Sequence, residues 1–164
     1  MRTYKLFRID VKGHLFPLYV NANKEIPVGV WLKAEEGELA KDGKHVKSKL
    51  GPLSYRPGWH SGEYPVATHI GEKADKGDSK PSYRPSWQVW AECEVHTDVD
   101  YTCQAGRWGL KRLPVHGGYW FKTNANMTGA WFISGEIRVN RILSDKEVAD
   151  INAKFGVSDL PRRK

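Results

Sequence analysis

Alternation of polar and apolar residues in two segments, interrupted at Trp90 and Phe132, is the feature that most limits how this chain can fold. A period of two positions is typical of a β-strand, because successive side chains point to opposite faces of a sheet. Residues 88–95 show it most clearly, with small or apolar side chains at Val89, Ala91, Cys93 and Val95. Residues 131–139 alternate in the same way, and we predict one strand there with Glu136 on its polar face.

Three further segments near the N-terminus have similar patterns. Residues 3–11, 14–20 and 27–34 predict three strands, and a turn at Lys12-Gly13 joins the first two. Residues 35–49 are polar and predict an exposed loop with at most one helical turn.

One helix has clear start and stop signals. Residues 144–147, Ser-Asp-Lys-Glu, form a capping box, in which the first and last side chains bond each other's backbone N–H groups. The helix places Val148, Ile151 and Phe155 on one face and ends at Gly156. Several strands, one clear helix and long loops predict an α+β fold with mainly antiparallel sheet and few helices.

The most unusual stretch is residues 51–62, which contains two prolines and three glycines. This composition prevents a regular helix and predicts a shaped loop. Residues 82–87 repeat residues 54–59, Ser-Tyr-Arg-Pro-Gly-Trp, in five of six positions. The repeat is compatible with coincidence or with two similar turns on one rim.

Length and composition favour one folded domain over residues 1–160, with a frayed tail at 161–164. Apolar residues make up 40% of the chain and include seven Trp, which is enough for a packed core and argues against disorder. The net charge of +7 suits a polyanionic partner such as nucleic acid, a phosphate-bearing cofactor, or simply a soluble surface.

The N-terminus has no long apolar run, so we expect neither a signal peptide nor a membrane span. The cysteines are Cys93 and Cys103, and without a secretory signal we expect free thiols in a cytoplasmic protein, a disulfide between them remaining open. Their spacing, with no nearby His pair, argues against a zinc site.

Two charged residues on predicted strands are candidates for chemistry. Glu136 would be held firmly on its strand, and Gly135 beside it would leave room for a ligand, which suits stabilisation of a developing cation. Arg8 lies within an apolar strand and has the planar geometry to hold a pyrophosphate or carboxylate. The alternative for both is an ordinary ion pair on the sheet surface.

The loop at 51–62 supplies a second set of candidates, which combines rings, a guanidinium and a hydroxyl: Tyr55, Arg56, Trp59, His60 and Ser61. Aromatic faces can stack on a base or a nicotinamide ring, and an adjacent Arg can meet a phosphate. Taken singly, Tyr55 and Trp59 could equally anchor the loop to the core.

Four pieces of the chain, read in order, resemble the ADP-ribosyltransferase superfamily. Residues 5–9, Lys-Leu-Phe-Arg-Ile, are similar to its opening strand. Residues 51–61 resemble the Gly-Leu…Arg…His-x-Ser segment of the RNA 2'-phosphotransferase branch, and residues 89–95 its central strand. Residues 135–142, Gly-Glu-Ile-Arg-Val-Asn-Arg-Ile, resemble the Glu-led strand of the DNA-modifying toxins. Ser134 stands where the arginine-modifying branch has a second acid, which argues against that branch.

This resemblance implies a split β-sandwich that grips NAD in a cleft and transfers ADP-ribose to an acceptor. Arg8 would hold the NAD phosphate or ribose, and Tyr55 or Trp59 would stack on nicotinamide. Glu136 would accept a hydrogen bond from the ribose 2'-hydroxyl and stabilise the cationic transition state. Similar loops in phage and mobile-element proteins suggest such an origin.

Two other functions remain open. The first is a metal-independent ribonuclease of toxin type, with His60 or His116 as acid and base and Arg56 or Arg107 stabilising the phosphorane. The second is a module without catalysis that binds nucleic acid or inhibits a host defence protein, which the positive charge and the repeated Ser-Tyr-Arg-Pro-x-Trp loops suit.

Overall fold

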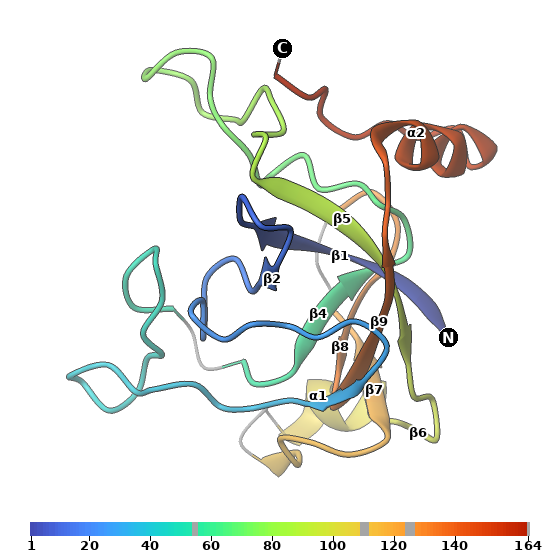
Figure 1. Cartoon of the computed structure of the whole chain (residues 1–164). Helices are drawn as coiled ribbons and strands as arrows, with labels where there is room; N and C mark the ends of the chain where they lie inside the picture. Colours follow the sequence, from blue (N-terminus) through green and yellow to red (C-terminus); the bar gives the residue numbers. More distant parts are fainter. Residues whose placement is uncertain (54–55, 109–111, 124–126, 164) are drawn as a thin grey trace.

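A computed structural model describes residues 1–53, 56–108, 112–123 and 127–163 of the chain. The strands of these residues form one sheet in the order β3-β9-β5-β1-β4-β8-β7-β6, with β2 paired to β1. Figure 1 shows the strands flanked by long loops on one side and by helix α2 beside one end of the sheet. The predicted α+β class, with mainly antiparallel sheet and few helices, is confirmed.

The first half of the sheet is built on the N-terminal strand. β1 (Arg2–Ile9) pairs antiparallel along its length with β5 (Gln88–Val95). β5 pairs with β9 (Glu136–Ile142), and β9 with the edge strand β3 (Trp31–Lys33). β2 (Leu15–Phe16) pairs with the end of β1. Apolar side chains from these five strands pack into one core cluster.

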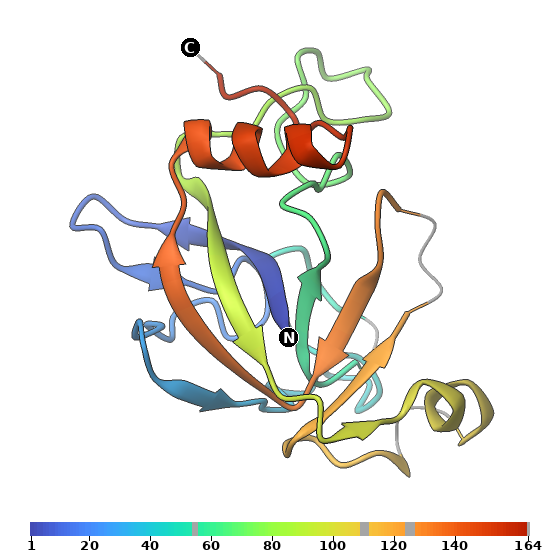
Figure 2. The same cartoon turned by 90° about the vertical axis from the view of Figure 1, so that its right-hand side faces the viewer.

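The second half contains β8 (Trp131–Ser134), which pairs antiparallel with β4 (Trp59–Gly62) on one side and with β7 (Tyr119–Lys122) on the other. β6 (Val99–Asp100) runs parallel to β7 and leads into the short helix α1 (Thr102–Trp108). The two halves meet where Tyr4 of β1 faces Gly62 of β4. Figure 2 shows the halves diverging from this junction, so the sheet opens into two wings.

Helix α2 (Asp145–Lys154) confirms the capping box. The Glu147 backbone N–H donates to Ser144 Oγ at 3.1 Å, and the Ser144 N–H donates to Glu147 Oε1 at 3.2 Å. Val148 and Ile151 pack against the core cluster that surrounds Trp90. Phe155 does not join them: it is 54% exposed and packs on the ring of Tyr64.

The predicted single strand at 131–139 is wrong, because Gly135 divides it into β8 and β9. The Gly135 N–H donates to the Tyr119 carbonyl, and its own carbonyl accepts from the Ala34 N–H. A Cβ at Gly135 would lie 2.4 Å from the Gly117 carbonyl oxygen. The space beside Glu136 is therefore filled by the protein's own backbone, not by a ligand as the sequence suggested.

The predicted strand at 88–95 is confirmed over its whole length as β5, and the three predicted near the N-terminus exist but are shorter. β1 ends at Ile9 because the Asp10 carboxylate accepts from the backbone N–H groups of Lys12 and His14 and starts the turn, leaving Val11 fully exposed. β2 and β3 retain two and three residues of their predicted ranges. Conversely, the last four residues of the predicted loop at 51–62 form β4.

The repeated Arg-Pro motif has two different environments. Arg56 is exposed, whereas the Arg84 side chain is 2% exposed and forms a salt bridge with Asp159, Nη2 to Oδ1, at 2.6 Å. Arg84 also donates to the carbonyls of Ala67 and Ile70 and to the side chain of Gln88.

The C-terminal segment, predicted to be frayed, is hydrogen-bonded to the body of the domain. The backbone of residues 161–163 bonds that of Arg84, and the Arg162 guanidinium lies 2.9 Å from both Asp145 carboxylate oxygens. The last residue, 164, lies outside the described part of the chain.

Candidate ligand-binding site

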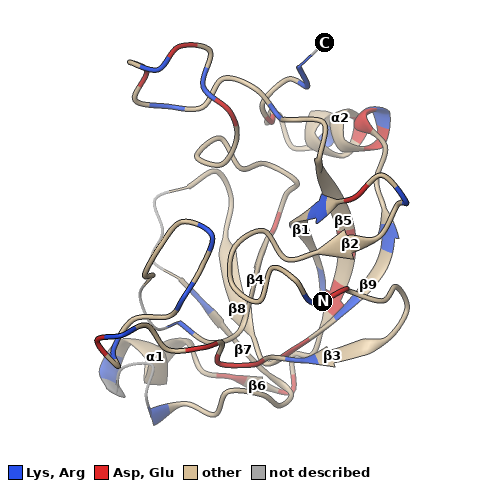
Figure 3. Cartoon of the chain, turned by 60° about the vertical axis from the view of Figure 1, so that its left-hand side comes forward, with Lys and Arg blue, Asp and Glu red and all other residues tan. Residues whose placement is uncertain are grey.

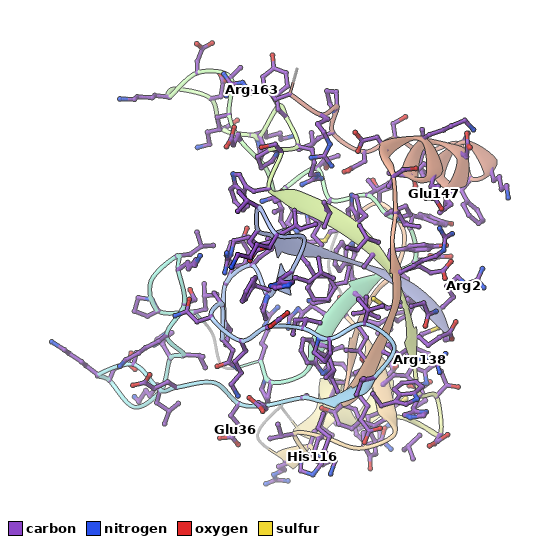
Figure 4. The ribbon with its side chains drawn as sticks, in the orientation of Figure 1. Arg2, Glu36, His116, Arg138, Glu147 and Arg163 are labelled. Carbon is purple, nitrogen blue, oxygen red and sulfur yellow. The ribbon has the colours of Figure 1, made fainter. Side chains whose placement is uncertain are left out.

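A cavity of about 770 Å³ lies beside the junction of the two wings. Its walls come from β1, β3, β4 and β8 and from residues 17–21, 24–26, 34–36, 46, 53, 56–58, 69–70, 123 and 127, which lie outside these strands. Cavities that bind small organic molecules have volumes of roughly 300–1,000 Å³ and mainly apolar walls. Figure 4 shows the lining residue Glu36 on the side of the long loops, and Arg2, Arg138 and Glu147 on the other side of the view.

Aromatic side chains form much of the wall: Tyr19, Trp31, Trp59, Trp131 and Phe132. The Trp59 indole is held in place, because its Nε1–H donates to the Leu32 carbonyl at 3.1 Å. Trp131 is in edge-on contact with the His69 ring, with centroids 5.8 Å apart. Fixed rings of this kind favour a planar ligand.

Lys5 is the charged group at the inner side of this cavity. It lies on the face of β1 that also carries Phe7, opposite Ala91 of β5. Its Nζ donates to the His60 carbonyl at 2.8 Å and lies 5.7 Å and 5.9 Å from the ring centroids of Phe7 and Trp59. Within the described residues, no carboxylate forms a salt bridge with it.

The surroundings of Lys5 disfavour its charged form. Burial lowers the pKa of Lys5 to about 8. The neighbouring Cys93 does not supply an anion at neutral pH, because burial raises the pKa of its thiol to about 12. Lys5 is therefore a desolvated cation that faces the cavity and has no salt bridge in the described part of the chain.

His60 lies next to Lys5 and is also desolvated. Burial, with the nearby Lys5 charge as the second cause, lowers the pKa of His60 to about 4. In the unfolded chain this imidazole titrates near 6.5, so between pH 6.5 and 4 the unfolded state binds more protons than the folded state. The His60 contribution therefore makes the free energy of unfolding decrease as the pH falls through this window.

We expect the melting temperature of the wild type to decrease more between pH 6.5 and pH 4 than that of His60→Gln, which cannot take up a proton. Thermal denaturation at half-unit pH steps measures both curves, and comparing them removes the contributions of other titrating groups. Parallel curves would show that His60 is not held neutral.

Three of the residues predicted from the loop do meet at the cavity: Arg56, Trp59 and His60 all line it. Ser61 does not line it, because its side chain is fully buried. The Ser61 Oγ has no hydrogen-bond partner within the described structure. Tyr55 lies outside the described residues.

Arg8 is at a different place. Its Nη2 donates to the Ala22 carbonyl at 2.8 Å, and its guanidinium lies 4.5 Å from the centre of the Phe16 ring. It is not among the residues that line the cavity. Arg8 therefore connects β1 to the loop that follows β2.

Glu136 is not beside Arg8. Arg8 faces Gln88 at the start of β5, whereas Ile137, the residue after Glu136, faces Val95 at its end. This register places the backbones of Arg8 and Glu136 roughly 25 Å apart along β5. Glu136 Oε2 instead lies 3.2 Å from His96 Nε2. The shared cleft predicted for Arg8 and Glu136 is therefore not formed.

Comparison of the chain with family models, with curated proteins and with solved structures finds no match. The resemblance to ADP-ribosyltransferases thus stays a prediction. In the described part of the chain, no group of three or more His, Cys, Asp or Glu side chains is placed to hold a metal ion. Neither helix there has the length and apolar character needed to cross a bilayer. Cys93 and Cys103 are both free, the first buried and the second exposed.

Lys5 is the functional candidate that the sequence analysis missed. A signal was present, because alternation along residues 3–9 places Lys5 on the same face as Phe7 and Ile9. A lysine on a core-facing position of a strand needs a counter-charge, water or a ligand.

Proposed function

We propose that this protein binds a small, planar organic anion in the cavity beside Lys5. The observation that carries the proposal is the desolvated Lys5 ammonium, which faces an aromatic cavity and forms no salt bridge with the described residues. A ligand carboxylate or phosphate would supply the missing anion, and the Trp59 and Trp131 indoles would cover its rings.

NAD belongs to this ligand class, since it has phosphates and planar rings. Arg56, Trp59 and His60 at the cavity support NAD binding there. The separation of Arg8 from Glu136 gives no support to ADP-ribose transfer by these two residues. Binding of an anion is therefore proposed without a transfer step.

Binding to nucleic acid has less support than a small ligand. Figure 3 shows Lys and Arg spread over loops, strands and α2 and interspersed with Asp and Glu, without a continuous basic stripe in that view. A polyanion is held by clustered phosphate contacts. A nucleic-acid or host-protein partner, ribonuclease activity, a phage origin and a cytoplasmic location stay predictions.

The test compares 2-naphthoate with 2-naphthamide, two ligands of the same ring and size that differ in charge. By isothermal titration at pH 7, we expect naphthoate to bind with a Kd of roughly 10 µM to 1 mM. Naphthamide should bind at least about tenfold more weakly, because it lacks the charged hydrogen bond to Lys5. NAD is titrated in parallel.

The matched variants are Lys5→Met and Lys122→Met, the second on an exposed position at the end of β7. Lys5→Met should reduce the preference for naphthoate to less than about threefold, and Lys122→Met should keep it. Equal binding of the two ligands to the wild type, or an unchanged preference in Lys5→Met, would contradict the proposal. If naphthoate binds and NAD does not, NAD is rejected as the ligand and the proposed binding of a planar anion stands.

A further inference from the structure

Lys5 differs from the two other lysines that line the cavity. Lys24 is 60% exposed and forms a salt bridge with Glu35, and Lys33 is exposed on the edge strand β3. Lys5 is surrounded by the Phe7 and Trp59 rings and donates to a single backbone carbonyl, that of His60. Its amine thus lies against two aromatic rings and has no salt bridge in the described chain.

An amine in such a place is suited to react with a carbonyl group. A lysine becomes nucleophilic when apolar surroundings favour the neutral amine, whose nitrogen then has a free electron pair. The cavity beside Lys5 has room for the reacting molecule, and aromatic side chains form much of its wall. No charged partner in the described chain has to be displaced first.

We propose that Lys5 forms an imine with an aldehyde or ketone attached to a planar ring. This inference rests on the proposed function, because it uses the same cavity and the same class of ring. The neutral Nζ adds to the carbonyl carbon to give a carbinolamine. The carbon–oxygen bond then breaks, and the oxygen leaves as water with the two hydrogens that the amine nitrogen carried. The reaction needs no oxidant and no metal.

The protonation of Lys5 supports this chemistry. With a pKa of about 8, half of the Lys5 amine is neutral at pH 8. An ordinary lysine has about 0.4% neutral amine at that pH. The rate of imine formation at Lys5 should therefore rise with a midpoint near pH 8.

The test treats the full chain at pH 8 with 2-naphthaldehyde and sodium cyanoborohydride, which reduces each imine to a stable amine. Peptide mass spectrometry then locates the label. We expect Lys5 to be labelled at least tenfold faster than Lys24 and Lys33, and saturating 2-naphthoate to slow labelling at Lys5. The Met1 amino group is an internal control, since it is also a primary amine but lies outside the cavity.

Two variants check the assignment on the intact protein. The fast labelling expected at Lys5 should be absent in Lys5→Arg, which keeps a positive charge but has no reactive amine. It should remain in Lys122→Arg. Equal labelling of Lys5, Lys24 and Lys33, or fast label on Met1 alone, would overturn the imine. If naphthoate binds in that case, the proposed binding function stands; if naphthoate does not bind either, both proposals fail.

Discussion

Replacing Arg84 by Met is expected to lower the free energy of unfolding by about 3–5 kcal/mol. The reason is the buried charge that the substitution leaves behind. The Asp159 carboxylate, 7% exposed, accepts from Arg84 at 2.6 Å and 3.2 Å, and removing the guanidinium leaves this anion without its cation. The carbonyls of Ala67 and Ile70 also lose their donor.

The repeated motif provides a control from the same chain. Arg56 occupies the equivalent position of the first repeat but is exposed, so Arg56→Met should change stability by less than about 0.5 kcal/mol. Urea denaturation measures both. The double variant Arg84→Met/Asp159→Leu should be less destabilised than the sum of its two single variants, because it leaves no buried ion unpaired. An Arg84→Met variant as stable as Arg56→Met would show that the ion pair contributes nothing.

The two copies of the Ser-Tyr-Arg-Pro-x-Trp motif show how far local sequence predicts local backbone conformation. The one position that differs between them is Gly58 in the first copy and Ser86 in the second. Gly58 has a φ of 123°, and a Cβ there would lie 2.3 Å from Ile133 Cγ2. A serine at position 58 would not tolerate this backbone conformation. The two copies of the motif therefore differ at this position, although their sequences are similar.

The strands and the helix that could be predicted have signals within a few residues. β5 alternates along most of its length, with Trp90 as the exception, and the capping box marks the start of α2 in four residues. Gly135 is different, since its effect depends on Gly117 and Tyr119, which reach it only through the folded sheet. The break between β8 and β9 could not be read from alternation, because the pattern continues across it.

The segments around β6, α1 and β7 had no usable signal. β7 reads Tyr-Trp-Phe-Lys, a run of rings without alternation, and α1 has seven residues with a glycine near its end. Packing against the cluster of Leu113, Tyr119, Phe121 and Ile133 stabilises them instead. Tertiary contacts of this kind override weak local preferences.

One part of the candidate site could be predicted from local sequence, and the other part depended on tertiary contacts. The composition of residues 51–62 indicated a place where rings and charges gather, and Arg56, Trp59 and His60 do line the cavity. The pairing of Arg8 with Glu136 depended on a family resemblance, and strand register decides it instead. β1 and β9 both pair with β5, but these two residues lie at its opposite ends.

Gly135→Ala is expected to lower the free energy of unfolding by about 3 kcal/mol, the upper part of the usual range for overpacking. The added Cβ would lie 2.4 Å from the Gly117 carbonyl oxygen, 2.8 Å from the Gly117 nitrogen and 2.5 Å from Tyr119 Cε1. Two of these neighbours are backbone atoms, so a change of side-chain rotamer cannot relieve the conflict. Separating the segments would also stretch the bond from the Gly135 N–H to the Tyr119 carbonyl.

Gly106→Ala is the matched control, because a Cβ at this position of α1 meets no atom within 4 Å. It should stabilise the protein by about 0.5 kcal/mol through its higher helix propensity. Urea denaturation of the two variants gives opposite signs if this account holds, with unchanged m-values for both. A Gly135→Ala variant as stable as the wild type would mean that residue 135 can move away from Gly117 and Tyr119 without cost. The close contact at Gly135 would then not determine where β8 ends and β9 begins.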